Sequence, residues 1–188
     1  YNTLGTLQGI RCEAAATNLM VETDLSNAAW VSTNTTEALD ATGPDGLTSA
    51  VTITADAGTA ATYIVDQFTA AATTTYSFSS YVKPGTTDFA YIELISGGAT
   101  LAGTYVVDAS DGTVTQTIAA AQSIYSISVG NGWYRFTITD ESIGSGVPSV
   151  RIGPHDGTSA AIWTAAGTET ILAFGPQAET GLSSTSFI

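Results

Sequence analysis

The sequence is short of charge, and above all of positive charge. Only 11% of its 188 residues are charged, against about 25% in an average globular domain. Four Lys and Arg residues face seventeen Asp and Glu residues, which gives a formal net charge of −13. Because nonspecific affinity for phosphates comes mostly from Lys and Arg, this balance argues against nucleic-acid binding and against an anionic membrane surface. A neutral or cationic ligand is compatible with it.

The residues that most often carry catalysis or bind metals are also scarce. The single cysteine, Cys12, excludes an intramolecular disulfide framework and a Cys-rich metal cluster. The single histidine, His155, could belong to a Ser/His/Asp triad, but the sequence contains no G-x-S-x-G nucleophile motif. The acids Asp45, Asp111 and Asp156 each precede a glycine, where they are expected to bond to the local backbone. No EF-hand-like run is present, so we assign no metal ligands. Because the nucleophile motif is missing and the acids have a structural explanation, we predict a noncatalytic protein with no cofactor.

Long apolar runs and a signal peptide are absent, so no membrane insertion is expected. The length suits one domain. Because the chain begins at Tyr1 rather than Met, we interpret it as a processed product or a piece of a longer polypeptide. Residues 1–16 are interpreted as a leader or linker segment and residues 17–188 as the domain.

Helical periodicity is nearly absent, and short runs with period-2 alternation recur between Gly, Pro, Asp and Asn. Strands are predicted over 49–55, 61–68, 75–83, 88–96, 103–108, 113–119, 148–153 and 168–174, with a hairpin over 123–139. About ten short strands of this kind predict an all-β, antiparallel jelly-roll β-sandwich. The pattern argues against a parallel α/β sheet, because no helical patterns separate the strands.

The run 75–83 (TYSFSSYVK) has the clearest alternation. One predicted face carries Tyr76, Phe78, Ser80 and Val82, and the other carries Ser77, Ser79, Tyr81 and Lys83. Tyr81 therefore stands opposite the core set on its own strand.

Residues 123–139 (SIYSISVGNGWYRFTIT) predict a hairpin with a defined register. Asn131-Gly132 is a strong signal for a two-residue type I′ turn, whose central residues both need φ > 0. This turn places Gly130 opposite Trp133. An uninterrupted ladder then pairs Val129 with Tyr134, Ser128 with Arg135, Ile127 with Phe136, Ser126 with Thr137 and Tyr125 with Ile138. The predicted core face carries the apolar pairs, and Trp133 and Arg135 lie on the polar face.

Two interpretations of Trp133 follow from this register. An exposed indole is a stacking surface for a sugar, with Arg135 and Tyr81 as further ligand contacts. Alternatively, Trp133 covers Gly130 across the hairpin, or packs under a loop or against Arg135. The sequence leaves both open.

Five stretches occur together in a characteristic order. They are GIRCEAAATNLMVETDLSNAAW at 9–30, GPDGLTSA at 43–50, YSFSSYVK at 76–83, VGNGWYR at 129–135 and GPQAETGLSSTSFI at 175–188. In this order they resemble a β-sandwich module common in bacteriophage tail, fibre and other virion structural proteins. That module is similar to jelly-roll carbohydrate-binding modules. Two details depart from its pattern, since Phe187 replaces a final Tyr and Leu47 interrupts P-D-G-T.

The resemblance implies a noncatalytic, adhesive module on the virion surface or outside the cell. Its expected partners are a cell-surface or environmental glycan, other virion proteins, or further copies of itself in a homo-oligomer. A purely structural capsid decoration or fibre module is one alternative. An accessory carbohydrate-binding module of a polysaccharide-degrading enzyme is another.

Three further residues have an expected structural role. Trp30 matches the first Trp of the module's pattern and is expected in the core at one edge of the sandwich. Gln177 and Glu179 are expected to satisfy backbone donors near the C-terminus rather than to bind ligand.

Overall fold

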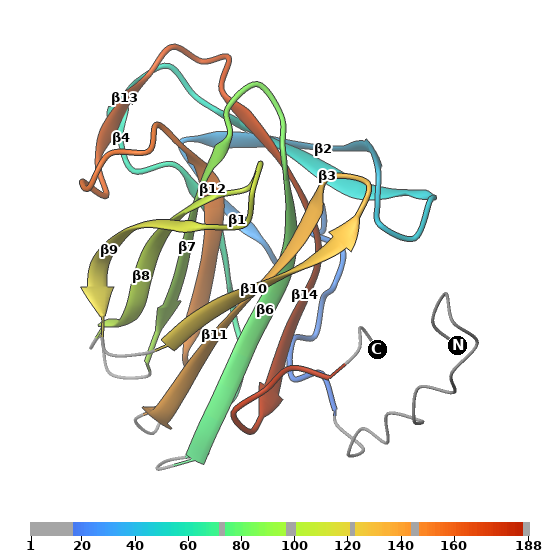
Figure 1. The fold of residues 1–188 in the computed structure, drawn as a ribbon, viewed down its shortest axis with the longest axis vertical. Helices are drawn as coiled ribbons and strands as arrows, with labels where there is room; N and C mark the ends of the chain where they lie inside the picture. The colour runs from blue at the N-terminus through green and yellow to red at the C-terminus, as the bar shows by residue number, and fades with distance from the viewer. Residues whose placement is uncertain (1–16, 72–73, 97–100, 121–122, 144–146, 186–188) are drawn as a thin grey trace, which may run out of the picture.

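Two antiparallel sheets of six strands each face one another in the computed structural model, which describes residues 17–71, 74–96, 101–120, 123–143 and 147–185 (Figure 1). Sheet A has the spatial order β1 (Val31–Thr33), β5 (Tyr63–Gln67), β12 (Ser149–His155), β7 (Phe89–Ile95), β8 (Leu101–Asp108) and β9 (Val114–Ala120). Sheet B has the order β10 (Ser123–Gly130), β11 (Trp133–Ile143), β6 (Thr74–Pro84), β14 (Thr170–Thr180), β3 (Thr48–Ala55) and β2 (Thr35–Thr42). A small third sheet pairs β13 (Trp163–Ala165) with β4 (Gly58–Ala60).

The predicted antiparallel β-sandwich is confirmed, and no helix occurs in the ranges that the structure describes. Each predicted strand coincides with an observed one. The sequence missed β1, β2, β4 and β13. β2 (TTEALDAT) is an edge strand whose side chains are mostly exposed, so burial leaves no alternating pattern in it. The other three have only three residues each.

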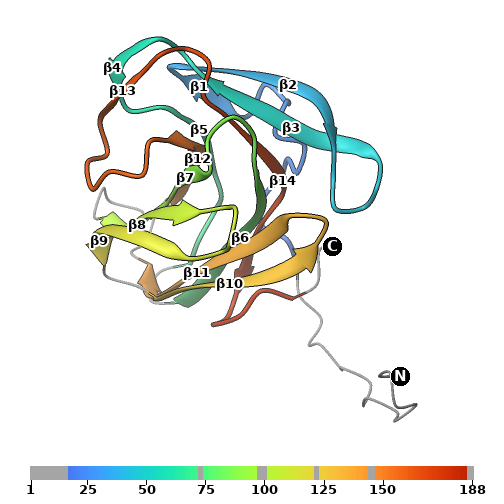
Figure 2. The same ribbon diagram turned by 45° about the horizontal axis from the view of Figure 1, so that its top comes forward.

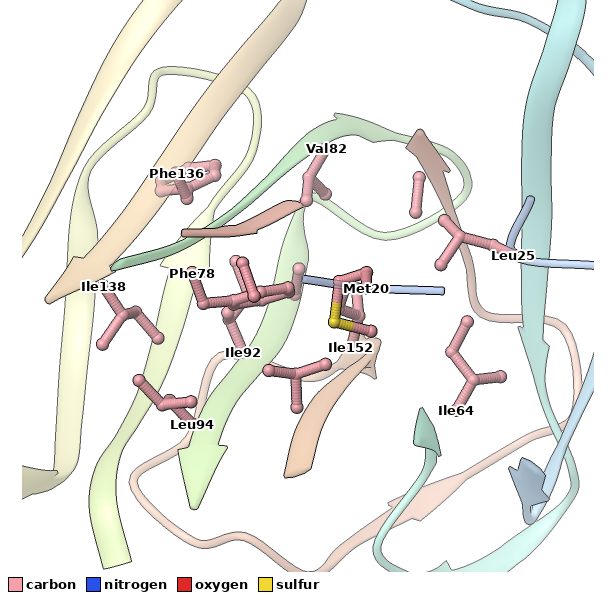
Figure 3. Close-up of a cluster of buried hydrophobic side chains, with 14 of the residues drawn as sticks. Met20, Leu25, Ile64, Phe78, Val82, Ile92, Leu94, Phe136, Ile138 and Ile152 are labelled. Carbon is pink, nitrogen blue, oxygen red and sulfur yellow. The ribbon is translucent and has the colours of Figure 1, made fainter. Parts of the chain in front are cut away.

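Apolar side chains from the inner faces of both sheets form the main core (Figure 3). Sheet A contributes Ile64, Ile92, Leu94 and Ile152, and sheet B contributes Phe78, Val82, Phe136 and Ile138. The alternation predicted for β6 is confirmed, because Tyr76, Phe78 and Val82 belong to this core while Tyr81 does not. Fully burying one such side chain contributes about 1.5–3 kcal/mol.

Residues 17–30, which precede β1, pack onto the sandwich without forming a strand. Met20 and Leu25 enter the main core, and Asn18 exchanges hydrogen bonds with the backbone of Pro176 and Ala178 in β14. Trp30 is buried in the same core, as predicted, and its indole donates to the carbonyl of Glu22. Cys12 and the rest of 1–16 lie outside the described residues.

The β10–β11 hairpin confirms the predicted turn but not the predicted register of β10. Asn131 and Gly132 have φ values of 53° and 78°, and Gly130 pairs with Trp133. A bulge then leaves Val129 unpaired, so Ser128 faces Tyr134, Ser126 faces Phe136 and Ile124 faces Ile138. Gly130 has a φ of 89°, which an extended strand residue does not adopt, and the ladder shifts by one residue there.

The bulge reverses the two faces of β10 and leaves β11 as predicted. Phe136 and Ile138 are buried in the core. The prediction that Tyr125, Ile127 and Val129 point inward is wrong, since they are 37%, 52% and 42% exposed.

The turn acids have the structural role that was predicted. Oδ1 of Asp45, Asp111 and Asp156 each accepts a backbone N–H two residues on, at 3.0, 2.8 and 3.0 Å. A nearby hydroxyl also donates to each one, from Ser49, Thr113 and Thr158. These bonds lower the pKa of Asp45 and of Asp111.

Candidate functional site

The three residues predicted to bind a ligand meet on the outer face of sheet B. Arg135 in β11 pairs with Tyr81 in β6, and its guanidinium carbon lies 5.2 Å from the centre of the Tyr81 ring. Trp133 joins Tyr81 in a small apolar cluster. The structure therefore brings the three together, but their exposed fractions are only 1% for Trp133 and 9% for Tyr81 and for Arg135.

The expectation that Trp133 is exposed is wrong, and the reason is the cluster around it. Trp133 shares the cluster with Ala41 in β2 and Ala50 in β3, and Leu172 and Phe174 in β14 pack against it. A Cβ built on Gly130 would meet nothing within 4 Å, so the indole does not cover that glycine. The apolar contacts across sheet B bury it instead. A ligand role for Trp133, Arg135 and Tyr81 stays a prediction.

Next to this cluster, the C-terminal segment forms hydrogen bonds with residues of sheet B. Arg135 donates to the carbonyl of Thr185 and, at 2.8 Å, to Ser79 Oγ. Glu179 Oε2 accepts the amide of Thr185 at 2.9 Å, and Glu179 Oε1 accepts its hydroxyl at 2.6 Å. Gln177 donates to the Thr185 hydroxyl at 3.3 Å and accepts from Arg135 at 3.3 Å.

These bonds confirm the prediction that Glu179 satisfies a backbone donor near the C-terminus. We call the residues Ser79, Arg135, Gln177, Glu179 and Thr185 the C-terminal latch. The latch and the apolar cluster together bury the three predicted ligand-binding side chains on the outer face of sheet B.

The outer face of sheet A carries an ion pair that the sequence did not reveal. Arg151 in β12 and Glu93 in β7 are cross-strand partners, and Arg151 Nη1 donates to Glu93 Oε2 at 2.7 Å. Glu93 Oε1 accepts the Thr104 hydroxyl at 2.7 Å. The Arg151 side chain is 28% exposed and that of Glu93 is 3% exposed. The ion pair therefore has a buried acid and an accessible cation.

An aromatic side chain lies directly against this ion pair. The guanidinium carbon of Arg151 is 4.5 Å from the centre of the Tyr63 ring, which is only partly buried. Tyr63 stacks in turn on Tyr91, with ring centres 6.3 Å apart. Burial and the nearby charge of Glu93 raise the pKa of the Tyr91 hydroxyl, so that hydroxyl stays protonated.

We call Tyr63, Glu93 and Arg151 the sheet A site. The ring offers an apolar surface, the guanidinium offers charged donors, and the carboxylate fixes the guanidinium. The Nε of Arg151 is buried and has no hydrogen-bond partner in the described part of the chain, so it is not a donor that a surface ligand reaches. The partly exposed ring and guanidinium suit a ligand that combines hydroxyls with an apolar ring face. Glu93 lies in a strand that is otherwise apolar (DFAYIELIS). A lone acid flanked by hydrophobic residues was the available signal for this site.

His155 extends the aromatic row and is structural. It stacks on Tyr91 at 6.1 Å and contacts Trp163 at 5.7 Å, and it is 1% exposed. Its Nε2 is 2.9 Å from the carbonyl of Ala160, and its Nδ1 accepts the amide of Gly157 at 3.1 Å. This arrangement requires the neutral ring with its proton on Nε2.

The neutral state of His155 predicts acid sensitivity. Burial lowers its pKa below the ordinary 6.5, against opposing effects of Ala160 and Asp156. Below about pH 6.5 the unfolded chain therefore binds a proton that the folded chain refuses, and the free energy of unfolding falls with falling pH. We expect urea denaturation to show this loss between about pH 7 and pH 5, and His155→Gln to flatten it. An equal slope in both proteins would show that His155 does not titrate in this way.

Other kinds of site find no support in the described ranges. Among those residues, no group of three or more His, Cys, Asp or Glu side chains is placed to hold a metal ion. No helix there has the length and apolarity needed to cross a bilayer.

Comparison with known proteins gives a match in structure only. No protein-family model and no curated protein matches the chain. A solved structure with a similar fold is the enzymatically active domain of tailspike protein 4 from bacteriophage CBA120, with a TM-score of 0.52 over 87% of this chain. The chain shares its fold with a part of that tailspike domain.

The extent of the match limits what it implies. The two sequences are 12% identical, and the matched region is 21% of the tailspike chain. The likeness agrees with the predicted resemblance to phage tail modules at the level of fold. This chain spans about a fifth of the tailspike, so that protein's activity is not carried over with the fold.

Proposed function

We propose that this chain is a noncatalytic, adhesive module of a bacteriophage tail or fibre, which binds a neutral glycan through the sheet A site. The observation that carries the proposal is the placement of Tyr63 against the Arg151–Glu93 ion pair on an outer sheet face. A pyranose presents C–H groups to an aromatic ring and hydroxyls to charged donors, and this site offers both partners.

Charge selects the class of glycan. The net charge of −13 repels an acidic polysaccharide at long range. A neutral sugar avoids this repulsion, and its hydroxyls accept hydrogen bonds from a guanidinium.

A noncatalytic role is supported by how the acid and the base of this face are bonded. Both oxygens of Glu93 are engaged, one by Arg151 and one by Thr104. Both nitrogens of His155 are engaged by backbone groups. Neither residue is poised to exchange a proton with a substrate.

The test is a glycan array on the folded chain, followed by titration of the best ligand against variants. We expect Tyr63→Ala to weaken binding by about 1–3 kcal/mol, the scale of aromatic stacking on a base. Arg151→Lys keeps the charge beside Glu93 but loses the guanidinium fork, and we expect it to weaken binding by about tenfold or more. Lys83→Ala, which removes a cation from sheet B, should leave binding unchanged.

Two results would count against the sheet A site. One is a folded chain that binds no glycan on the array. The other is a Tyr63→Ala variant that binds as well as the parent, which would favour a glycan site on sheet B.

A second candidate function is a structural module whose partners are copies of itself or other virion proteins. The exposed apolar side chains of β10 favour it, because binding a sugar does not require them.

A further inference from the structure

One edge strand of sheet B, β10, exposes a row of apolar side chains. β10 pairs only with β11 in the described sheets and lies at the border of the sandwich (Figure 2). The bulge at Val129 turns Tyr125, Ile127 and Val129 outward, with exposed fractions of 37%, 52% and 42%. An uncovered edge strand of this kind offers both apolar surface and free backbone groups to another strand.

The two edge strands on this side of the sandwich, β9 and β10, contain no charged residue. No Asp, Glu, Lys, Arg or His occurs between Asp111 and Arg135, and this run supplies β9 and β10, the adjacent edges of the two sheets. The opposite edge of sheet B is different. β2 carries Glu37 and Asp40, and acids on an edge strand discourage pairing with another strand.

We propose that a second copy of this chain pairs with β10, edge to edge and antiparallel, so that sheet B continues from one copy into the other. Each copy has a net charge of −13, so most faces of two copies repel each other. The β10 edge, whose own residues are uncharged, is where they approach with the least repulsion. A two-fold contact then places the same apolar residues of both copies together.

The proposal does not rest on glycan binding, and its test is the oligomeric state. Sedimentation velocity over a concentration series, in reducing buffer because Cys12 is unpaired within the chain, should show a reversible dimer. Ile127→Lys places two like charges at the contact, and we expect it to raise the dissociation constant by about tenfold or more. Added salt should not weaken the parent dimer, because no ion pair holds it.

Leu39→Lys is the matched control. Leu39 is 45% exposed, similar to Ile127, but lies on β2 at the other edge of sheet B. We expect this variant to dimerise like the parent. Thermal melts of both variants show that each is folded, and Tyr125→Ser replaces Ile127→Lys if the latter is not.

Three outcomes overturn the proposal. The first is a parent chain that stays monomeric at high concentration. The second is an oligomer that Leu39→Lys weakens as much as Ile127→Lys does. The third is an oligomer that neither β10 variant affects.

Discussion

Trp133→Ala is expected to destabilise the protein by about 3–5 kcal/mol, the range for removing a buried large aromatic side chain. The indole is 1% exposed and belongs to one apolar cluster with Ala41, Ala50 and Tyr81 from other strands of sheet B. Alanine would leave a cavity that the strands around it cannot close, because each of them is held in the sheet by its backbone hydrogen bonds.

Urea denaturation of the parent and variant measures this change. Trp133→Phe keeps part of the volume and should lose clearly less stability. Leu47→Ala is the control, since Leu47 is 66% exposed and a surface truncation changes stability by about 0.5 kcal/mol or less. If Trp133→Ala unfolded with the same midpoint as the parent, the apolar cluster would not be a packed unit, and a surface role for the indole would regain support.

The hairpin that carries Trp133 shows how far the sequence predicts the structure. The Asn-Gly turn chemistry correctly predicted the turn and the pairing of Gly130 with Trp133. The faces of β11 were also predicted correctly, because its alternation is enforced by the core beneath Phe136 and Ile138. The faces of β10 were not, because Gly130 permits a bulge that moves the ladder by one residue. A glycine directly before the turn was the available signal.

The sequence also did not predict which side chains on an outer sheet face are buried. Alternation correctly assigned Tyr81 and Arg135 to the outer face. An outer face is exposed, however, only where no other residues pack on it. Residues distant in sequence pack against these side chains: Ala41 and Ala50 belong to the same apolar cluster as Tyr81, and Thr185 of the C-terminal segment bonds to Arg135. Such contacts leave no periodic trace in the strand that they cover. The Glu93–Arg151 ion pair was missed for a related reason, since its partners are 58 residues apart.

The second large effect is expected for Arg135→Ala, which removes the cation of the C-terminal latch. Arg135 is 9% exposed and binds Ser79, Gln177 and the carbonyl of Thr185. Removing one partner of a buried charged network typically costs about 3–5 kcal/mol, because the remaining polar groups lose their hydrogen bonds without regaining water. We expect a loss in this range by urea denaturation. Lys83→Ala, which removes a cation from the neighbouring strand, should change stability by less than about 1 kcal/mol.

The latch predicts a local effect as well as a global one. The amide of Thr185 donates to Glu179, so its hydrogen exchange reports whether the C-terminal segment is held on sheet B. In Arg135→Ala, the carbonyl of Thr185 loses its partner. Hydrogen exchange should then accelerate more at the amide of Thr185 than at the amide of Ile152 in the core. Arg135→Lys preserves the charge but not the fork that reaches Ser79 and Thr185 together, so partial release is expected. Equal acceleration at both positions would mean that Arg135 stabilises the whole sandwich without holding the segment. Selective release at Thr185 would establish that this arginine, placed outward by the alternation of β11, serves to fasten the chain's own C-terminal segment over the face of sheet B.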